Sequence, residues 1–211
     1  MQLQLRSGVL FVTPAERAET KRDLIVEEAS RLMYERGTGL GVDTLVSEIG
    51  VAKMTLYKHF PTKTDLIVAC LEHLDDCHRA RLSGQVDWSS SPAERLLSVF
   101  DSLREWFAMP SFRGCAFVNA TVELADTSPP VRNAVREHKN AMRAWVVKLV
   151  EECELPNANF VASQIAQLME GATTTALLER DPAVADVAQA TALQVLDKAK
   201  ASTGASAPLR R

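Results

Sequence analysis

The stretch that decides the fold runs from Val42 to Phe60 and reads VDTLVSEIGVAKMTLYKHF. Its first apolar residues recur at helical spacing, which predicts a short helix over residues 42–49 with one buried face. Gly50 follows at the position where a helix commonly ends in a left-handed residue that only glycine adopts without strain. A second short helix is predicted over residues 52–59. Two short helices joined by a tight glycine turn form a helix-turn-helix, whose second helix can enter the major groove of DNA.

The composition favours a helical protein with a core of its own. The chain has 211 residues, of which 46% are hydrophobic and 6% aromatic, and no long strand-like alternation is evident. The net charge of -3 excludes a strongly basic protein that coats nucleic acid. Residues 1–66 carry equal numbers of basic and acidic side chains, so the excess acid lies beyond them. DNA binding would therefore depend on the local arrangement of charge.

The cysteines and the apolar runs predict a cytoplasmic protein. Four cysteines occur without a CxxC pair, as expected of free thiols in a reducing compartment. The longest apolar run near the start, Val9–Val12, is too short for the core of a secretory leader. No stretch approaches the roughly 20 apolar residues that cross a bilayer. We therefore expect no contact with a membrane.

Helical periodicity and helix-breaking residues predict an all-α fold of nine helices. Thr62 is a plausible N-cap for the fourth of them, with Asp65 three residues later. The predicted helices cover residues 15 or 20 to 36, 42–49, 52–59, 63–82, 92–109, 115–125, 131–154, 159–180 and 182–199.

These helices predict four parts of the chain. Residues 1–14 form a flexible arm, and residues 15–66 form the helix-turn-helix domain. Residues 67–200 form a second helical domain. Residues 201–211 form a disordered tail.

The segment IGVAKMTLYKHF at residues 49–60, followed by Lys63 and Leu66, closely resembles the signature of the TetR (tetracycline-repressor) family of transcriptional regulators. The resemblance is strong over residues 18–75 and weak over the rest of the chain. The sequence departs from the family pattern at Gly41, Val46 and Met54, where a Thr or Ser cap, an Ala, and a Gly, Ala or Pro respectively are common. The family is all-α and regulates transcription.

The resemblance and the helix-turn-helix geometry together predict which side chains meet DNA. The leading end of the second helix reaches base edges, whereas its later residues and the start of the next helix meet phosphates. The predicted base readers are Lys53, Met54 and Thr55, and the predicted phosphate contacts are Tyr57, Lys58, His59, Lys63 and, less strongly, Thr44. In the alternative interpretation, Tyr57 and His59 are half-buried packing residues.

By analogy with the family, the second domain is expected to hold a mostly apolar pocket for a hydrophobic or aromatic effector. Each aromatic residue taken alone is better explained as an ordinary core position. The predicted lining is Trp106, Phe107, Phe117, Asn119, Glu123, Met142, Trp145, Gln164, Met169 and Thr173.

The cysteines offer two further hypotheses. Cys115 opens a predicted helix, where its pKa could be lowered and it could sense oxidants or electrophiles, although packing is the simpler role. Cys70, His73 and Cys77 share one helix face and are good ligands for soft metals. A fourth ligand is not obvious, so the sequence predicts no metal and no cofactor.

The last two predicted helices carry small and apolar residues over most of their surface. Paired with a second copy they would form a four-helix interface with two-fold symmetry, although they could also be buried within one chain. The sequence therefore predicts a homodimeric repressor that binds a palindromic operator in double-stranded DNA and is released by a small effector. Activation, redox control through Cys115 and a helical ligand-binding protein remain alternatives. An enzyme is not predicted, because no catalytic constellation stands out.

Overall fold

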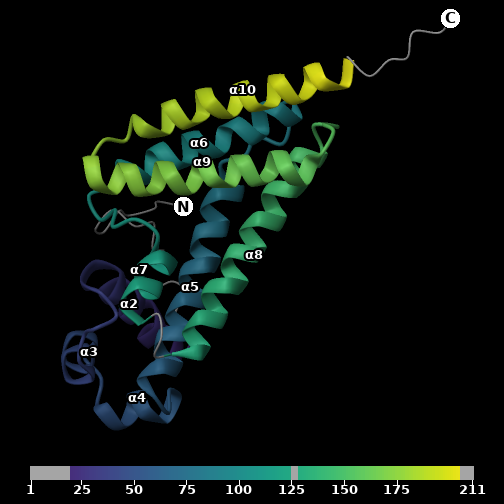
Figure 1. The fold of residues 1–211 in the computed structure, drawn as a ribbon. Helices are drawn as coiled ribbons and strands as arrows, with labels where there is room; N and C mark the ends of the chain where they lie inside the picture. The colour runs from purple at the N-terminus through teal and green to yellow at the C-terminus, as the bar shows by residue number, and fades with distance from the viewer. Residues whose placement is uncertain (1–19, 125–127, 205–211) are drawn as a thin grey trace, which may run out of the picture. The chain divides into compact units, whose positions relative to one another are not determined.

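The structure is a computed structural model that describes residues 20–124 and 128–204 of the 211-residue chain. Over these ranges it contains nine α-helices, which confirms the predicted all-α class (Figure 1). The predicted arm over residues 1–14 lies outside the described residues. The helices are α2 (Lys21–Arg36), α3 (Val42–Ile49), α4 (Lys53–His59), α5 (Lys63–Gly84), α6 (Pro92–Phe107), α7 (Ala116–Leu124), α8 (Pro129–Glu151), α9 (Ala158–Glu179) and α10 (Val184–Gly204).

Most helix boundaries follow the local signals in the sequence. The helix α3 has the predicted bounds, and α2 starts after Thr20, whose hydroxyl oxygen accepts a hydrogen bond from the Asp23 amide at 3.3 Å. The prediction of a tail from residue 201 was wrong at its beginning, because α10 continues to Gly204. The residues that precede Gly204 include Ala199 and Ala201, and alanine is the strongest helix former, so the helix continues through them. Residues 205–211 lie outside the described part of the chain.

The chain folds into two compact units that differ from the predicted domains. The first unit combines Met1–Ala80 with Met109–His138, and the second combines Arg81–Ala108 with Lys139–Arg211. The helix α7 therefore belongs to the same unit as the helix-turn-helix, whereas the sequence assigned it to the effector domain. Both α5 and α8 contribute residues to the two units.

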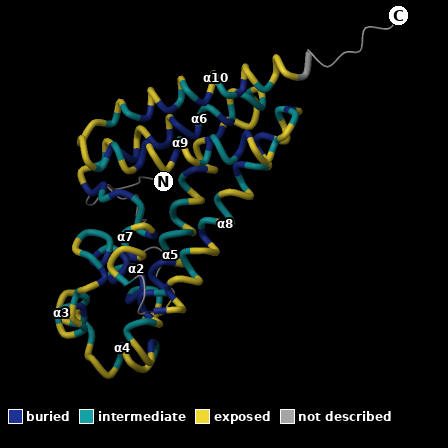
Figure 2. Tube along the Cα trace, viewed as in Figure 1, coloured by how far each residue is buried: buried dark blue, intermediate teal, exposed yellow. Residues whose placement is uncertain are grey.

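The core of the first unit is formed by α2, α3, α4, α5 and α7, with a contribution from the start of α8. Figure 2 shows its buried positions in dark blue. Leu45, Leu56 and Leu66 are fully buried, so each helix of the helix-turn-helix is anchored by a leucine. Phe117 and Ala120 bring α7 into the same core, which explains why α7 joins this unit.

In the second unit, α6, α9 and α10 pack against one another. Ser91 and Glu94 begin α6 with a capping box, in which the Ser91 amide donates to the Glu94 carboxylate at 2.9 Å. The Gln189 side chain joins α10 to α6 by donating to the Leu97 carbonyl at 3.0 Å and to Asp101 at 2.9 Å. None of the helices in the described ranges is both long and apolar enough to span a lipid bilayer.

Candidate nucleic-acid interface

The turn between α3 and α4 is closed by a left-handed glycine, as the sequence predicts. Gly50 has φ 76° and ψ 35°, a conformation that a side chain would strain. The amides of Gly50 and Val51 both donate to the Val46 carbonyl, at 3.0 and 3.1 Å. These bonds satisfy a carbonyl that the end of the helix would otherwise leave open. The turn therefore fixes where α4 begins.

The helix α4 is anchored on one side and open on the other. Leu56 is fully buried and Phe60, the C-cap, is 1% exposed. On the open side Met54 is 86% exposed and Tyr57 is 40% exposed. Met54 therefore makes little contribution to the core, so its exposure needs another explanation. The other predicted contacts on α4 are either exposed, as Lys53 and Lys58 are, or half-buried, as Thr55 and His59 are.

Lys53 is held in an ion pair that the sequence analysis did not predict. Its ammonium donates to Asp43 Oδ1 at 2.7 Å, and Asp43 lies in the first turn of α3. This hydrogen bond and the carboxylate charge raise the pKa of Lys53. The pair joins the start of α3 to the start of α4 on the surface. To reach a guanine acceptor, Lys53 would have to leave Asp43.

The start of α5 carries the predicted phosphate contact Lys63. The capping box is confirmed, because the Thr62 amide donates to the Asp65 carboxylate at 2.9 Å and the Asp65 amide donates to the Thr62 hydroxyl at 3.1 Å. Lys63 is half-buried, and this burial lowers its pKa, while the nearby charge of Glu123 acts in the opposite direction. A partly buried lysine beside a helix N-terminus is suited to hold a phosphate in register.

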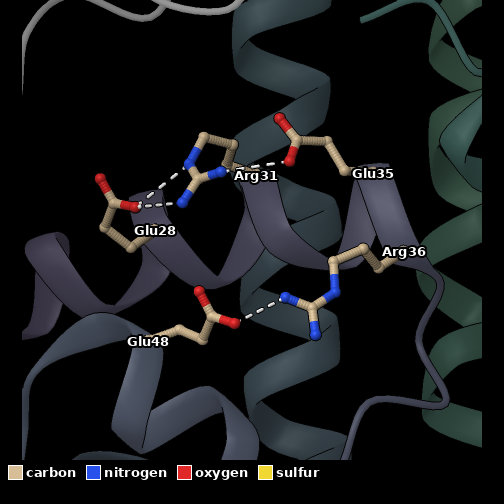
Figure 3. A network of polar contacts seen from close by, with 5 residues as sticks. All are labelled: Glu28, Arg31, Glu35, Arg36 and Glu48. Atoms are coloured by element: carbon tan, nitrogen blue, oxygen red, sulfur yellow. Dashed lines mark hydrogen bonds and ion pairs between the residues drawn. The ribbon is translucent and has the colours of Figure 1, made fainter.

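One surface ion pair connects α2 to α3, and two more lie along α2 (Figure 3). Arg36 of α2 contacts Glu48 of α3 at 2.7 Å, and Arg31 bridges Glu28 and Glu35 along α2 at 3.0 and 3.1 Å. Both partners of the first pair are more than two-fifths exposed, so it adds no more than about 1 kcal/mol to stability. Its role is to hold the surface of α3 against α2.

The N-terminus of α3 has no side-chain cap, as is also the case for α4 and α9. Gly41 is the N-cap and makes no side-chain hydrogen bond, so the first amides of α3 are not satisfied by a cap. Thr44 lies half-buried in this first turn. Free amides and a hydroxyl at a helix start can bind a phosphate oxygen, and the role of Thr44 stays a prediction.

The ten residues predicted to line an effector pocket divide between the two units. Phe117, Asn119 and Glu123 belong to the first unit, and all the others belong to the second. Their role in binding an effector stays a prediction. The seven in the second unit are Trp106, Phe107, Met142, Trp145, Gln164, Met169 and Thr173.

Three polar groups of that set already have partners within the protein. The Asn119 side-chain amide donates to the Arg113 carbonyl at 2.9 Å, and the Thr173 hydroxyl donates to the Met169 carbonyl at 2.8 Å. Glu123 accepts a hydrogen bond from the Thr38 amide at 2.6 Å. These three side chains therefore have structural roles that the sequence analysis did not predict.

The cysteines differ in their surroundings. Burial raises the pKa of the Cys70 thiol to about 12, which makes this thiol a poor nucleophile. Cys77 Sγ lies 3.6 Å from His73 Nε2. Cys115 is half-buried and precedes α7, and its carbonyl accepts from the Asn119 amide at 3.0 Å. Across residues 20–124 and 128–204, no three His, Cys, Asp or Glu side chains are grouped as metal ligands would be.

Comparisons with known proteins agree with this arrangement. A family model described as bacterial regulatory proteins, tetR family, matches residues 25–70, and one described as tetracyclin repressor-like, C-terminal domain, matches residues 92–192. The chain is 23% identical over 188 residues to the HTH-type transcriptional regulator YjdC of Escherichia coli, which covers 87% of this chain and 97% of that protein. It is 34% identical over 94 residues to the HTH-type transcriptional regulator TtgR of Pseudomonas putida, covering 42% of this chain and 45% of TtgR. The crystal structure of SCO4454, a TetR-family transcriptional regulator from Streptomyces coelicolor, is similar with a TM-score of 0.77 and 29% identity, covering 84% of this chain and 95% of that one.

Proposed function

Because the chain belongs to the TetR family of bacterial regulatory proteins, we propose that it is a repressor that binds a palindromic operator as a homodimer and leaves it when a small effector binds. The chain is a DNA-binding transcriptional regulator and not an enzyme. The sense of the regulation, the dimer and the effector are the parts that we propose.

The open face of α4 is the observation that carries the proposal. Lys53, Met54 and Tyr57 are exposed on a helix whose opposite side is fixed in the core by Leu56 and Phe60. A rigidly held helix with an exposed face is what insertion into the major groove needs. Lys53 supplies donors for guanine, and Met54 supplies an apolar surface for a thymine methyl group.

Exposed apolar side chains on α9 and α10 support the dimer. Phe160 and Leu178 of α9 are 66% and 77% exposed, and Val187 and Leu193 of α10 are 69% and 44% exposed. Phe160 and Leu178 are 18 residues apart, which is five helical turns, so they share one face of α9. Burying these side chains against a second copy would remove them from water and place two recognition helices on one DNA.

The proposed release depends on an effector that binds one conformation more tightly than another. An effector held by the second unit would favour a state in which the two recognition helices no longer match the spacing of the half-sites. Because α5 contributes residues to both units, it is the proposed lever.

Selection of operators from a random pool of double-stranded DNA tests the proposal. The full-length protein is expected to enrich a palindrome whose half-sites lie roughly one helical turn apart, about 10 base pairs centre to centre, or a multiple of it. A gel shift on the enriched duplex, with a scrambled duplex as the control, measures specificity. Enrichment of no sequence, or of a single half-site bound by one protomer, would contradict the proposed dimeric repressor.

Changing Lys63 to Ala should weaken binding to operator and scrambled DNA to a similar extent, because a phosphate contact carries no sequence information. The slope of log affinity against log salt should fall by about 0.9 for each lysine lost. Titrations by fluorescence anisotropy at several salt concentrations measure both effects. Lys148→Ala is the matched control, because Lys148 is an exposed lysine on α8 of the second unit. An unchanged slope with altered base preference would show that Lys63 reads sequence instead.

A further inference from the structure

The helix α7 is connected to the DNA-binding unit by polar contacts as well as by its core residues. The Tyr34 hydroxyl, near the end of α2, accepts from the Arg113 amide at 3.0 Å and donates to the Gly114 carbonyl at 2.9 Å. Phe117 is 4% exposed and Ala120 is fully buried in the core of the first unit. The segment leading into α7 is thus attached to α2 at one end.

The other end of α7 is attached through Glu123. Its carboxylate accepts a hydrogen bond from the Thr38 backbone amide at 2.6 Å and a second, short one from the Thr38 hydroxyl. Thr38 lies in the loop between α2 and α3 and is 8% exposed. One carboxylate oxygen that accepts two hydrogen bonds from a single buried residue fixes the position of that residue, because losing the acceptor would leave a buried donor unsatisfied.

Gly37 makes room for this contact. It has φ +91°, and a Cβ atom built on it would lie 3.0 Å from Glu123 Oε1. A side chain at this position would therefore displace the carboxylate as well as strain the backbone. The absence of a side chain at Gly37 therefore leaves space for the Glu123 carboxylate to contact Thr38.

Glu123 also affects a second residue of the candidate interface, Lys63 at the start of α5. Its charge opposes the lowering of the Lys63 pKa, which places the carboxylate within electrostatic range of that ammonium. Thr38 lies three residues before Gly41, the N-cap of α3, and Asp43, the partner of Lys53, follows in the first turn. One side chain of α7 therefore touches the loop that leads into α3 and lies near the start of α5.

We propose that Glu123 is a positioning residue of the DNA interface, which holds the α2–α3 loop so that the start of α3, with Asp43 in its first turn, meets DNA in one fixed geometry. This role replaces the place in the effector pocket that the sequence suggested for Glu123. The proposal rests on the proposed function, since it assumes that α3 and α4 bind DNA. It needs the hydrogen bonds of the carboxylate and does not need its charge.

Four variants separate hydrogen bonding from charge and from general stability. Glu123→Gln keeps an oxygen that accepts from Thr38 but removes the charge, and Glu123→Ala removes both. Thr38→Val removes the hydroxyl at the other end of the contact while keeping the side-chain shape. Val122→Ala is the matched control, because Val122 is the neighbouring residue on α7 and is 78% exposed.

The first measurement uses the free protein and needs no DNA. Amide hydrogen exchange at Thr38 is expected to be roughly tenfold or more faster in Glu123→Ala than in the parent, because the amide loses its acceptor. Glu123→Gln and Val122→Ala should exchange within about threefold of the parent rate. Slow exchange at Thr38 in Glu123→Ala would overturn the proposal, whether or not an operator is available.

The second measurement uses the selected palindromic duplex. Glu123→Ala and Thr38→Val are expected to lower operator affinity by roughly tenfold with an unchanged salt slope, each measured well below its unfolding midpoint, and the double variant should be no weaker than Glu123→Ala alone. Glu123→Gln should bind close to the parent affinity. Equal effects of Gln and Ala with a changed salt slope would show a charge effect and overturn positioning. If Thr38 exchanges as expected but no duplex is ever bound specifically, the proposed function fails while the loop contact holds.

Discussion

Replacing Phe60 by Ala is expected to lower the free energy of unfolding by about 3–5 kcal/mol, the cost of removing a large buried aromatic ring. Phe60 is 1% exposed and is the C-cap of α4, so its ring fills the space below the recognition helix. The guanidinium of Arg22 lies over the ring, 5.2 Å from its centroid, and this cation–π contact would be lost as well. Urea unfolding followed by circular dichroism measures the change.

Met54→Ala is the control for Phe60→Ala, because Met54 lies on the same helix and is 86% exposed. Its effect on unfolding should stay within about 0.5 kcal/mol. Operator affinity should fall more in Met54→Ala than in Phe60→Ala when each variant is measured well below its unfolding midpoint. If Phe60→Ala is no less stable than Met54→Ala, the ring is not part of the core and α4 is held in another way.

Replacing Leu178 by Glu is expected to convert the proposed dimer to a monomer and to weaken operator binding by about 10²-fold or more, because a lone protomer loses the effective concentration supplied by its partner. Leu178 is 77% exposed on α9 in a single protomer. A two-fold interface would receive two carboxylates that have no positive partner, and burying them would be costly. Sedimentation velocity over a range of concentrations gives the oligomeric state.

Val122→Glu introduces the same charge at a position of nearly equal exposure, 78%, on α7 of the first unit. It should leave the sedimentation coefficient unchanged. A Leu178→Glu protein that sediments as the parent does would place the dimer interface elsewhere. A parent protein that sediments as a monomer and still binds the full palindrome would contradict the dimer itself.

The parts of the fold that depend on neighbouring residues in the chain could be predicted from the sequence. The bounds of α3, the left-handed Gly50 and the Thr62–Asp65 capping box all follow from preferences that act over three or four residues. The open and buried sides of α4 follow from helical periodicity in the same way, with Leu56 inside and Met54 outside.

The parts that depend on distant residues could not be predicted. Nothing near Phe117 in the sequence indicates that it packs with α2 and α5, so the sequence placed α7 in the second predicted domain, whereas its packing places it in the first unit. Glu123 and Thr38 are 85 residues apart, and Asp43 and Lys53 come from different helices. Their pairing follows from the packing of helices, which local pattern does not fix. A single charged residue on an otherwise uncharged helix, as Glu123 is, was the available signal.

The ion pair between Lys53 and Asp43 would affect how long the protein stays bound to DNA sequences other than its operator. In the proposed complex, Lys53 gains a replacement for the lost carboxylate only where guanine presents its two acceptors. At other base pairs Asp43 keeps the lysine, so a random site gains less from this side chain. Random sites outnumber an operator by roughly a million or more, so even a small loss at each one shortens the search. Asp43, which touches no base in the proposed complex, would thereby shorten the time that the protein takes to reach its operator.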